Sequence, residues 1–194
     1  MNDYYNELPS GAKVIKVIDA KDKKTILWMN VVAMLLMVVA AYPFLVLKPV
    51  DFSAVDLFLP FSVIVIAGMI IYIVLHELTH GLMYKLFTKQ KLTFGMTLFV
   101  AYCGVPNIYV SKKVSLYAVL APFVVFSVIL VPVLILLPAN LIYLAFVIIF
   151  AVHFGGCVGD LYVTLVLVRL KGSILMNDTG PKQTFYRLEG ITTD

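Results

Sequence analysis

Residues 57–87 read LFLPFSVIVIAGMIIYIVLHELTHGLMYKLF, an almost unbroken apolar run. A helix rises 1.5 Å per residue, so about 20 such residues cross the hydrocarbon core of a bilayer, and this run is long enough to project beyond it. Of the 194 residues in the chain, 62% are hydrophobic and 13% are charged, whereas soluble domains have about 45–50% apolar and about 25% charged residues. We therefore expect a polytopic membrane protein whose main partner is the lipid bilayer.

Four apolar stretches have the length of a membrane span. They cover residues 26–47, 57–87, 114–137 and 141–168. The expected fold class is thus an all-α polytopic membrane protein with four transmembrane helices. Its membrane domain covers residues 25–170, between an N-terminal segment, residues 1–24, and a C-terminal tail, residues 171–194.

Lysine and arginine residues are unevenly distributed among the segments that connect these spans. Fourteen of the 15 lie in residues 1–24, in residues 85–113 or after residue 168, and the exception is Lys48. Because basic residues favour the cytoplasmic side, this distribution predicts a multi-pass protein of the cell membrane with both the N-terminus and the C-terminus in the cytoplasm. The basic residues are spread between apolar runs, so nucleic acid is not an expected partner.

The segment between the second and third spans has the pattern of a strand. Apolar side chains alternate with a period of two over residues 92–102, and the Cys-Gly-Val-Pro-Asn sequence at residues 103–107 is typical of a turn. With residues 108–110 as the return strand, we expect a small β-hairpin on the cytoplasmic side. The alternative is an interfacial loop. Apolar residues at positions 14, 15, 17 and 18 fit either a short interfacial helix or a strand.

Ionisable side chains occur in two of the predicted spans. All three histidines, His76, His80 and His153, lie there, together with Glu77 and Asp160. An ionisable group at the bilayer centre costs about 2.5–3.5 kcal/mol, which makes each one a candidate functional residue. The first two histidines belong to an H-E-x-x-H motif. Since residues four apart share one face of a helix, both can bind one zinc ion while the glutamate acts as the general base.

A catalytic zinc ion needs a third protein ligand, with the fourth position left for water. Asp160 is the leading candidate because it lies nineteen residues after Leu141, just as His76 lies nineteen residues after Leu57 in a span of the same direction. Equal helical rise places both in the cytoplasmic half of the membrane. An ionised Asp160 and an ionised Glu77 would also neutralise Zn²⁺ in a medium of low dielectric constant.

Other residues remain open for related roles. His153 and Cys157, which lie in the same span as the aspartate, are alternative third ligands. His153 and Asn107 are also candidates for substrate binding, and a packing role is the alternative for the histidine. Gly155 and Gly159 form a G-x-x-x-G pattern, and Gly81 follows the second zinc histidine. These small residues are expected to let the fourth span approach the second.

The sequence resembles a known group of membrane proteins. The residues that carry the resemblance are the string His-Glu-Leu-Thr-His-Gly at 76–81, the hairpin that follows it, and Gly-Asp-Leu at 159–161. They resemble the short bacterial membrane proteins grouped as zincin peptidases and, more distantly, the core of the site-2-type intramembrane metalloproteases. The resemblance implies that His76, His80 and Asp160 are the zinc ligands and Glu77 the base. Site-2 proteases usually carry Asn and Pro ahead of Leu-Asp-Gly, a pattern from which this chain departs.

The predicted function is zinc-dependent hydrolysis of a peptide bond in or beside the bilayer, with a peptide or a transmembrane helix as the substrate. The main alternative is a non-catalytic zinc-binding membrane scaffold or regulator, which would tolerate loss of Glu77. A metal transporter would need polar residues throughout several spans, and the first and third spans have almost none. Haem ligation by His76 and His153 would produce a visible absorption band.

Overall fold

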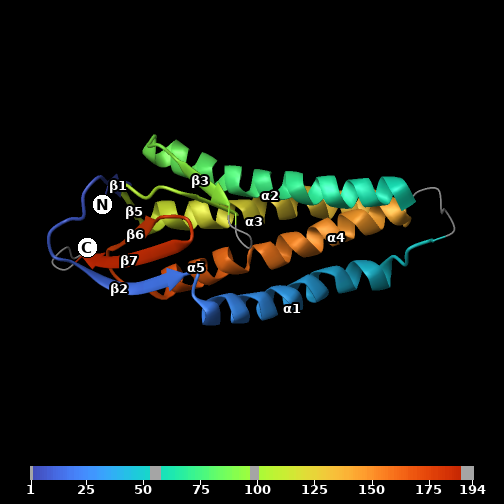
Figure 1. Ribbon diagram of the computed structural model, residues 1–194, viewed down its shortest axis with the longest axis horizontal. Helices are drawn as coiled ribbons and strands as arrows, with labels where there is room; N and C mark the ends of the chain where they lie inside the picture. The colour runs from blue at the N-terminus through green and yellow to red at the C-terminus, as the bar shows by residue number, and fades with distance from the viewer. Residues whose placement is uncertain (1, 53–57, 97–100, 189–194) are drawn as a thin grey trace. The chain divides into compact units, whose positions relative to one another are not determined.

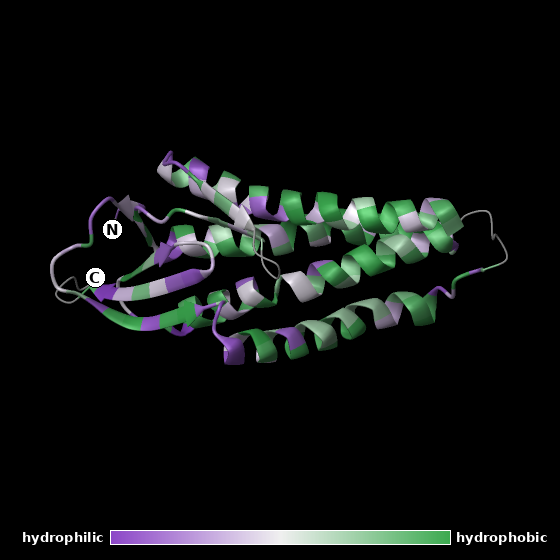
Figure 2. Cartoon of the chain, in the orientation of Figure 1, coloured by the Kyte–Doolittle hydropathy of each residue, from purple (hydrophilic) through white to green (hydrophobic). Residues whose placement is uncertain are grey.

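A computed structural model describes residues 2–52, 58–96 and 101–188. Four helices of these segments are long and apolar enough to cross a membrane, which confirms the number of spans predicted (Figure 1). Figure 2 shows hydrophobic residues along most of their length. The helices are α1 (Lys23–Leu47), α2 (Phe58–Thr88), α3 (Lys112–Leu136) and a fourth, Leu141–Arg169, that consists of α4 (Leu141–Gly156) and α5 (Val158–Arg169).

The fourth predicted span is therefore interrupted. Cys157 separates α4 from α5, although its N–H still donates a hydrogen bond to the His153 carbonyl at 3.1 Å. Two glycines end α4, and glycine has a low helix propensity. Because a new helix begins at Val158, Asp160 lies in the first turn of α5, where the helix dipole stabilises a carboxylate.

A five-stranded antiparallel sheet accompanies the helices, so the all-α prediction is incomplete. Its strand order is β1-β5-β6-β7-β2. The strands are β1 (Tyr4–Tyr5), β2 (Ala12–Asp19), β5 (Tyr109–Ser111), β6 (Ile174–Asp178) and β7 (Lys182–Leu188). Residues 14–18, whose sequence fits either a short helix or a strand, thus belong to the strand β2. In β6, Ile174, Leu175 and Met176 are all fully buried, so this strand has no period-two alternation by which the sequence could reveal it.

A hairpin does lie between α2 and α3, but its strands differ from those predicted. β3 (Thr93–Met96) pairs antiparallel with β4 (Ala101–Gly104), with Thr93 opposite Gly104. The single strand expected over 92–102 is therefore wrong, and residues 97–100 of it lie outside the described residues. The expected return strand became β5, which pairs with β1 and β6 instead. Alternation indicates an extended chain but not the point at which it reverses.

The chain divides into two compact units, each with its own core. The first comprises Met1–Ile26, His76–Pro122 and Asp160–Asp194, and contains both sheets. The second comprises Leu27–Leu75 and Phe123–Gly159. The core of the second unit includes Ala40, Tyr72, Leu130, Leu134, Tyr143, Val147, Ile149 and Phe150. The residues predicted to form the zinc site all belong to the first unit, whereas His153 belongs to the second.

Glycines make close contacts that differ from those expected. A Cβ atom on Gly155 would overlap the side chain of Met37 and lie 3.2 Å from the carbonyl oxygen of Ala33, so this glycine packs α4 against α1. A Cβ atom on Gly81 would meet side chains of the β3–β4 hairpin segment, and one on Gly159 would have no described atom within 4 Å. The expected approach of the fourth span to the second is confirmed at the neighbouring Gly156, where a Cβ atom would lie 3.7 Å from the Tyr72 hydroxyl on α2, but not at Gly155, Gly159 or Gly81.

Candidate metal centre

Three side chains of the first unit converge on one point. The Nε2 atoms of His76 and His80 lie 3.2 Å apart. His76 Nε2 is 3.2 Å from Oδ2 of Asp160, and His80 Nε2 is 3.4 Å from Oδ1 of the same carboxylate. Among the described residues, these form the one group of three or more His, Cys, Asp or Glu side chains whose ligand atoms lie within 4.8 Å of one another.

Helix geometry explains how the two histidines meet. His76 and His80 are four residues apart in α2 and share one face, with their rings edge to face and the ring centroids 4.9 Å apart. Both histidines are buried, in a helix whose other residues are mostly apolar. Asp160 reaches them from the first turn of α5. Because of the interruption at Cys157, this carboxylate lies at the N-terminus of a helix, where the helix dipole stabilises its negative charge.

The spacing of these atoms fits a tetrahedral ion. Zinc binds histidine nitrogen and carboxylate oxygen at about 2.0–2.1 Å, so two ligands of a tetrahedral site lie about 3.3 Å apart. The observed separations of 3.2, 3.2 and 3.4 Å agree with that value. Three ligands of a tetrahedron leave one position for water or substrate, as in catalytic zinc sites.

The hydrogen bonding of Asp160 also favours a bound cation. Its Oδ2 atom is buried and accepts no hydrogen bond from any residue of the described segments. Such an oxygen is costly to bury unless a metal ion, or a proton on the His76 Nε2 atom 3.2 Å away, compensates for it. The two facing Nε2 atoms have the same requirement, since one proton or one cation must lie between their lone pairs. The residues present therefore fit a divalent metal ion.

The outer nitrogen of His80 fixes how this ring is protonated. Nδ1 lies 2.8 Å from the carbonyl oxygen of Ala118 on α3. A carbonyl only accepts hydrogen bonds, so Nδ1 carries the hydrogen and the lone pair of the neutral ring is on Nε2. Metal-binding histidines commonly make such a bond through the nitrogen that does not bind the metal. This contact could not be predicted from the sequence, because a backbone acceptor leaves no side-chain motif.

Glu77 is placed beside the cluster and outside the ligand set. Its carboxyl group is half-buried, and its electrostatic neighbours are His80, His76, Asp160 and the backbone N–H of Cys103 on β4. The carboxyl group is thus near both the His76–His80–Asp160 cluster and the Cys103 N–H of the hairpin. A glutamate that adjoins a metal site without occupying it is available for proton transfer.

Cys103 is the cysteine of the first unit. It is 5% exposed, and burial, with further contributions from the carboxylates of Glu77 and Asp178, raises the pKa of its thiol to about 12. Metal ligation requires the thiolate. The raised pKa therefore disfavours Cys103 as a metal ligand.

His153 belongs to a separate polar cluster in the second unit. Its Nε2 lies 3.0 Å from Oγ of Ser127, and its Nδ1 lies 3.1 Å from the hydroxyl of Tyr72. Phe123 stacks on the ring with a centroid distance of 5.7 Å, and the side chain is fully buried. Cys157 Sγ lies 3.6 Å from His153 Nδ1, so the two alternative zinc ligands contact each other. These contacts favour a packing role for His153, and its role in substrate binding stays a prediction.

Asn107, the other predicted substrate-binding residue, is exposed in the turn between β4 and β5. The amide of Asn177 holds that turn by donating to the carbonyl oxygens of Pro106 at 2.8 Å and Ile108 at 2.9 Å. A role for Asn107 in substrate binding stays a prediction.

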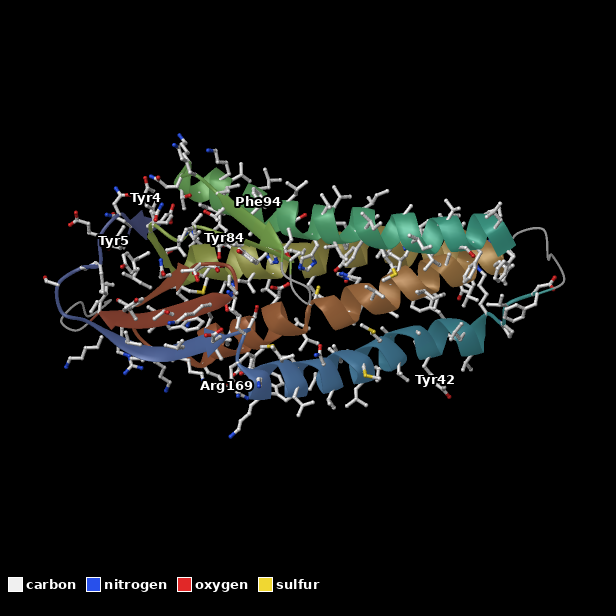
Figure 3. All side chains as sticks on the ribbon, viewed as in Figure 1. Tyr4, Tyr5, Tyr42, Tyr84, Phe94 and Arg169 are labelled. Carbon is white, nitrogen blue, oxygen red and sulfur yellow. The ribbon has the colours of Figure 1, made fainter. Side chains whose placement is uncertain are left out.

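A buried pair near the cluster was also missed by sequence analysis. The hydroxyl of Tyr84, labelled in Figure 3, donates to Oδ2 of Asp178 at 2.6 Å, and the backbone N–H of Gly180 donates to Oδ1 at 2.9 Å. Tyr84 follows His80 by one helical turn, so this bond ties the motif helix to the turn between β6 and β7. The sequence signal was the Asp-Thr-Gly turn at 178–180, which lies in the segment expected to be a tail.

A model of the family described as "Putative zincin peptidase" matches residues 69–175, more than half of the chain. The chain belongs to this family. The matched segment includes the H-E-x-x-H motif, the hairpin, Asp160 and the start of β6. The resemblance to zincin peptidases is thus confirmed, whereas the likeness to site-2 proteases stays a prediction. No curated protein and no solved structure matches the chain. Membership of the zincin peptidase family supports a metallopeptidase with zinc as its cofactor.

Proposed function

We propose that the protein is a membrane-embedded zinc metallopeptidase that hydrolyses a peptide bond in or beside the bilayer. The observation that carries the proposal is the convergence of His76, His80 and Asp160 in helices of membrane-spanning length. Glu77 lies beside them and is not needed as a ligand. The zincin family supports the same chemistry.

His76, His80 and Asp160 would hold the zinc ion through two imidazole nitrogens and a carboxylate oxygen. Zinc supplies a Lewis acid that lowers the pKa of water and polarises a scissile carbonyl group. Glu77 takes a proton from the attacking water and delivers it to the leaving amine nitrogen. Zn²⁺ with ionised Asp160 and Glu77 sums to zero charge, which limits the cost of burying the site in a medium of low dielectric constant.

The substrate binds as an extended segment. Peptide bonds in a transmembrane helix are hydrogen-bonded within the helix, so the segment must unwind before hydrolysis. In the two-stranded sheet, β3 and β4 are each paired on one side in the described structure, and β4 carries the Cys103 N–H beside Glu77. An unwound substrate can pair with this hairpin, which replaces its lost hydrogen bonds.

The proposed topology has both termini in the cytoplasm. It is supported by the concentration of lysine and arginine in residues 1–24, in residues 85–113 and after residue 168. With that orientation His76 and Asp160 lie in the cytoplasmic half of the membrane, and water enters from the cytoplasm.

Replacement of Glu77 tests the proposal. Glu77→Gln keeps the size of the side chain but removes the base, so zinc content is expected to remain that of the wild type while hydrolysis falls by about 10²- to 10⁴-fold. Full-length protein in liposomes is assayed with two fluorescent probes, casein and a labelled model transmembrane helix, and zinc is measured on the same samples. A zinc-loaded Glu77→Gln protein that cleaves either probe at the wild-type rate contradicts the assignment.

A further inference from the structure

The carbonyl group that holds His80 lies at an unusual point of α3. Ala118 and Pro122 are four residues apart in the interior of this helix. In a regular helix, the N–H of residue 122 would donate to the carbonyl of residue 118. Proline has no N–H, and its ring pushes the carbonyl four residues earlier away from the helix axis. The Ala118 carbonyl is therefore released from the regular helical hydrogen bond.

A released carbonyl in this position needs another donor. Ala118 is fully buried, and an unpaired backbone group away from water costs several kcal/mol in a membrane. The Nδ1–H of His80 supplies the donor at 2.8 Å. One hydrogen bond thus satisfies two groups, because His80 requires an acceptor for Nδ1–H and α3 requires a donor for the carbonyl that Pro122 releases.

We propose that Pro122 is a positioning residue of the metal centre. By keeping the Ala118 carbonyl available, it holds His80 in the tautomer with hydrogen on Nδ1 and directs Nε2 toward His76 and Asp160. The inference rests on the zinc site of the proposed function but not on catalysis. It assigns a role in metal binding to a residue that touches neither metal nor substrate.

Alanine at position 122 reverses the arrangement. Pro122→Ala restores an N–H that competes with His80 for the Ala118 carbonyl. It also removes an interior proline, which is much less favourable than alanine in a helix. The variant is therefore expected to have equal or higher thermal stability without metal, together with a weaker zinc site. Loss of outer hydrogen-bond partners lowers metal affinity by about 10- to 100-fold, and we expect about tenfold here because the carbonyl keeps a second lone pair.

Pro132 offers a matched control in the same helix. It also lies in the interior of α3, and the carbonyl that it releases belongs to Val128, whose side chain is 68% exposed. The Nδ1–H of His80 donates to the Ala118 carbonyl and not to that of Val128. Pro132→Ala is expected to stabilise the metal-free protein in a similar way while zinc affinity stays at the wild-type value.

The experiment measures zinc affinity of the full-length protein in detergent by competition with a chelator, together with thermal unfolding of the metal-free form. Nitrogen-15 NMR of histidine-labelled, metal-free protein reports the His80 tautomer directly, and Pro122→Ala is expected to reduce the population with hydrogen on Nδ1. Replacement of Pro122 by lactic acid, which forms an ester without an N–H, is expected to restore both affinity and tautomer.

Two results would overturn the role of Pro122. One is zinc affinity in Pro122→Ala within about twofold of the wild type with an unchanged His80 tautomer. The other is an equal loss of affinity in Pro132→Ala, which would assign the effect to straightening of α3. Both are independent of peptide hydrolysis, so failure of Glu77→Gln to abolish cleavage would refute the proposed function and leave this inference standing. No zinc binding by the wild type would refute both.

Discussion

Two buried polar clusters that contain histidine occur in the helices of this protein, and they differ in how their polar atoms are paired. In the second unit, the ring nitrogens of His153 face the hydroxyl groups of Ser127 and Tyr72. In the first unit, the Nε2 atoms of His76 and His80 face each other and a carboxylate oxygen that accepts no hydrogen bond from the described residues. Both clusters are buried in apolar surroundings, so burial alone does not distinguish them.

The difference lies in what each cluster needs for its polar groups to be satisfied. In the His153 cluster, both ring nitrogens can be hydrogen-bonded without an added ion, because each hydroxyl group can donate to or accept from an imidazole nitrogen. The cluster around Asp160 has lone pairs that converge, so it needs an additional proton or a metal cation between them. The convergence of acceptors around His76 and His80 is thus what makes them candidate ligands and distinguishes them from His153.

The strongest test of this distinction is removal of Asp160. Asp160→Ala deletes one of three ligands and the charge that opposes the cation, so zinc affinity is expected to fall by more than about 100-fold, beyond the range of outer-shell changes. Chelator competition on the full-length protein measures it. His153→Phe serves as the control and is expected to bind zinc as the wild type does. Unchanged zinc stoichiometry and affinity in Asp160→Ala would mean that the two helices do not share an ion.

The converse test concerns stability. His153→Phe keeps an aromatic ring among Phe123 and its neighbours but leaves the hydroxyls of Ser127 and Tyr72 without the imidazole. A buried polar group that loses its partner costs about 1–3 kcal/mol, so the free energy of unfolding is expected to fall by that amount or somewhat more. Thermal unfolding of metal-free protein in detergent measures the change. A His153→Phe protein that has wild-type stability but no longer binds zinc would contradict this assignment, because His153 would then serve metal binding and not packing.

The sequence predicted the metal centre better than the fold around it. Residues four apart on a helix have a fixed relation, so the H-E-x-x-H motif placed His76, Glu77 and His80 without knowledge of the rest. Asp160 was found from two further constraints, charge and depth in the bilayer. The carboxylate that meets the two histidines could be anticipated because few carboxylates occur in the spans at all.

The sheet was missed for a physical reason. Its strands come from residues 4–19, 109–111 and 174–188, and the pairing between them depends on contacts far apart in the chain. The buried strand β6 has no alternation, and β1 has only two residues. From the sequence, only Pro122 indicates that the Ala118 carbonyl lacks its helical hydrogen bond. That His80 is its hydrogen-bond partner follows only from the packing of α2 against α3 in the first unit.

A third buried group refines the comparison, because Asp178 is a carboxylate that is saturated with donors. Asp160 Oδ2 has no hydrogen-bond donor among the described residues, whereas Asp178 accepts hydrogen bonds from Tyr84 and from the Gly180 N–H. Even so, burial raises the pKa of Asp178 above its ordinary value of 3.8, and the bonds from Tyr84 and Gly180 oppose this shift only in part. Neutral donors thus compensate only in part for the burial of this carboxylate.

Asp178→Asn is expected to produce the smallest effect, a change in how stability depends on pH. Because the folded state holds its proton to a higher pH than the unfolded chain, the contribution of Asp178 is fully present below about pH 4 and is lost as the pH rises through the raised pKa. The loss amounts to about 1.4 kcal/mol for each unit of pKa difference. Asparagine resembles the protonated acid, so the variant should match the wild type near pH 4 and lose less stability above it. Thermal unfolding of both metal-free proteins against pH measures this difference, since the other titrating groups are common to both. Parallel curves would show that Asp178 is ionised as readily in the fold as in the unfolded chain, and that neutral donors alone can hold a buried carboxylate.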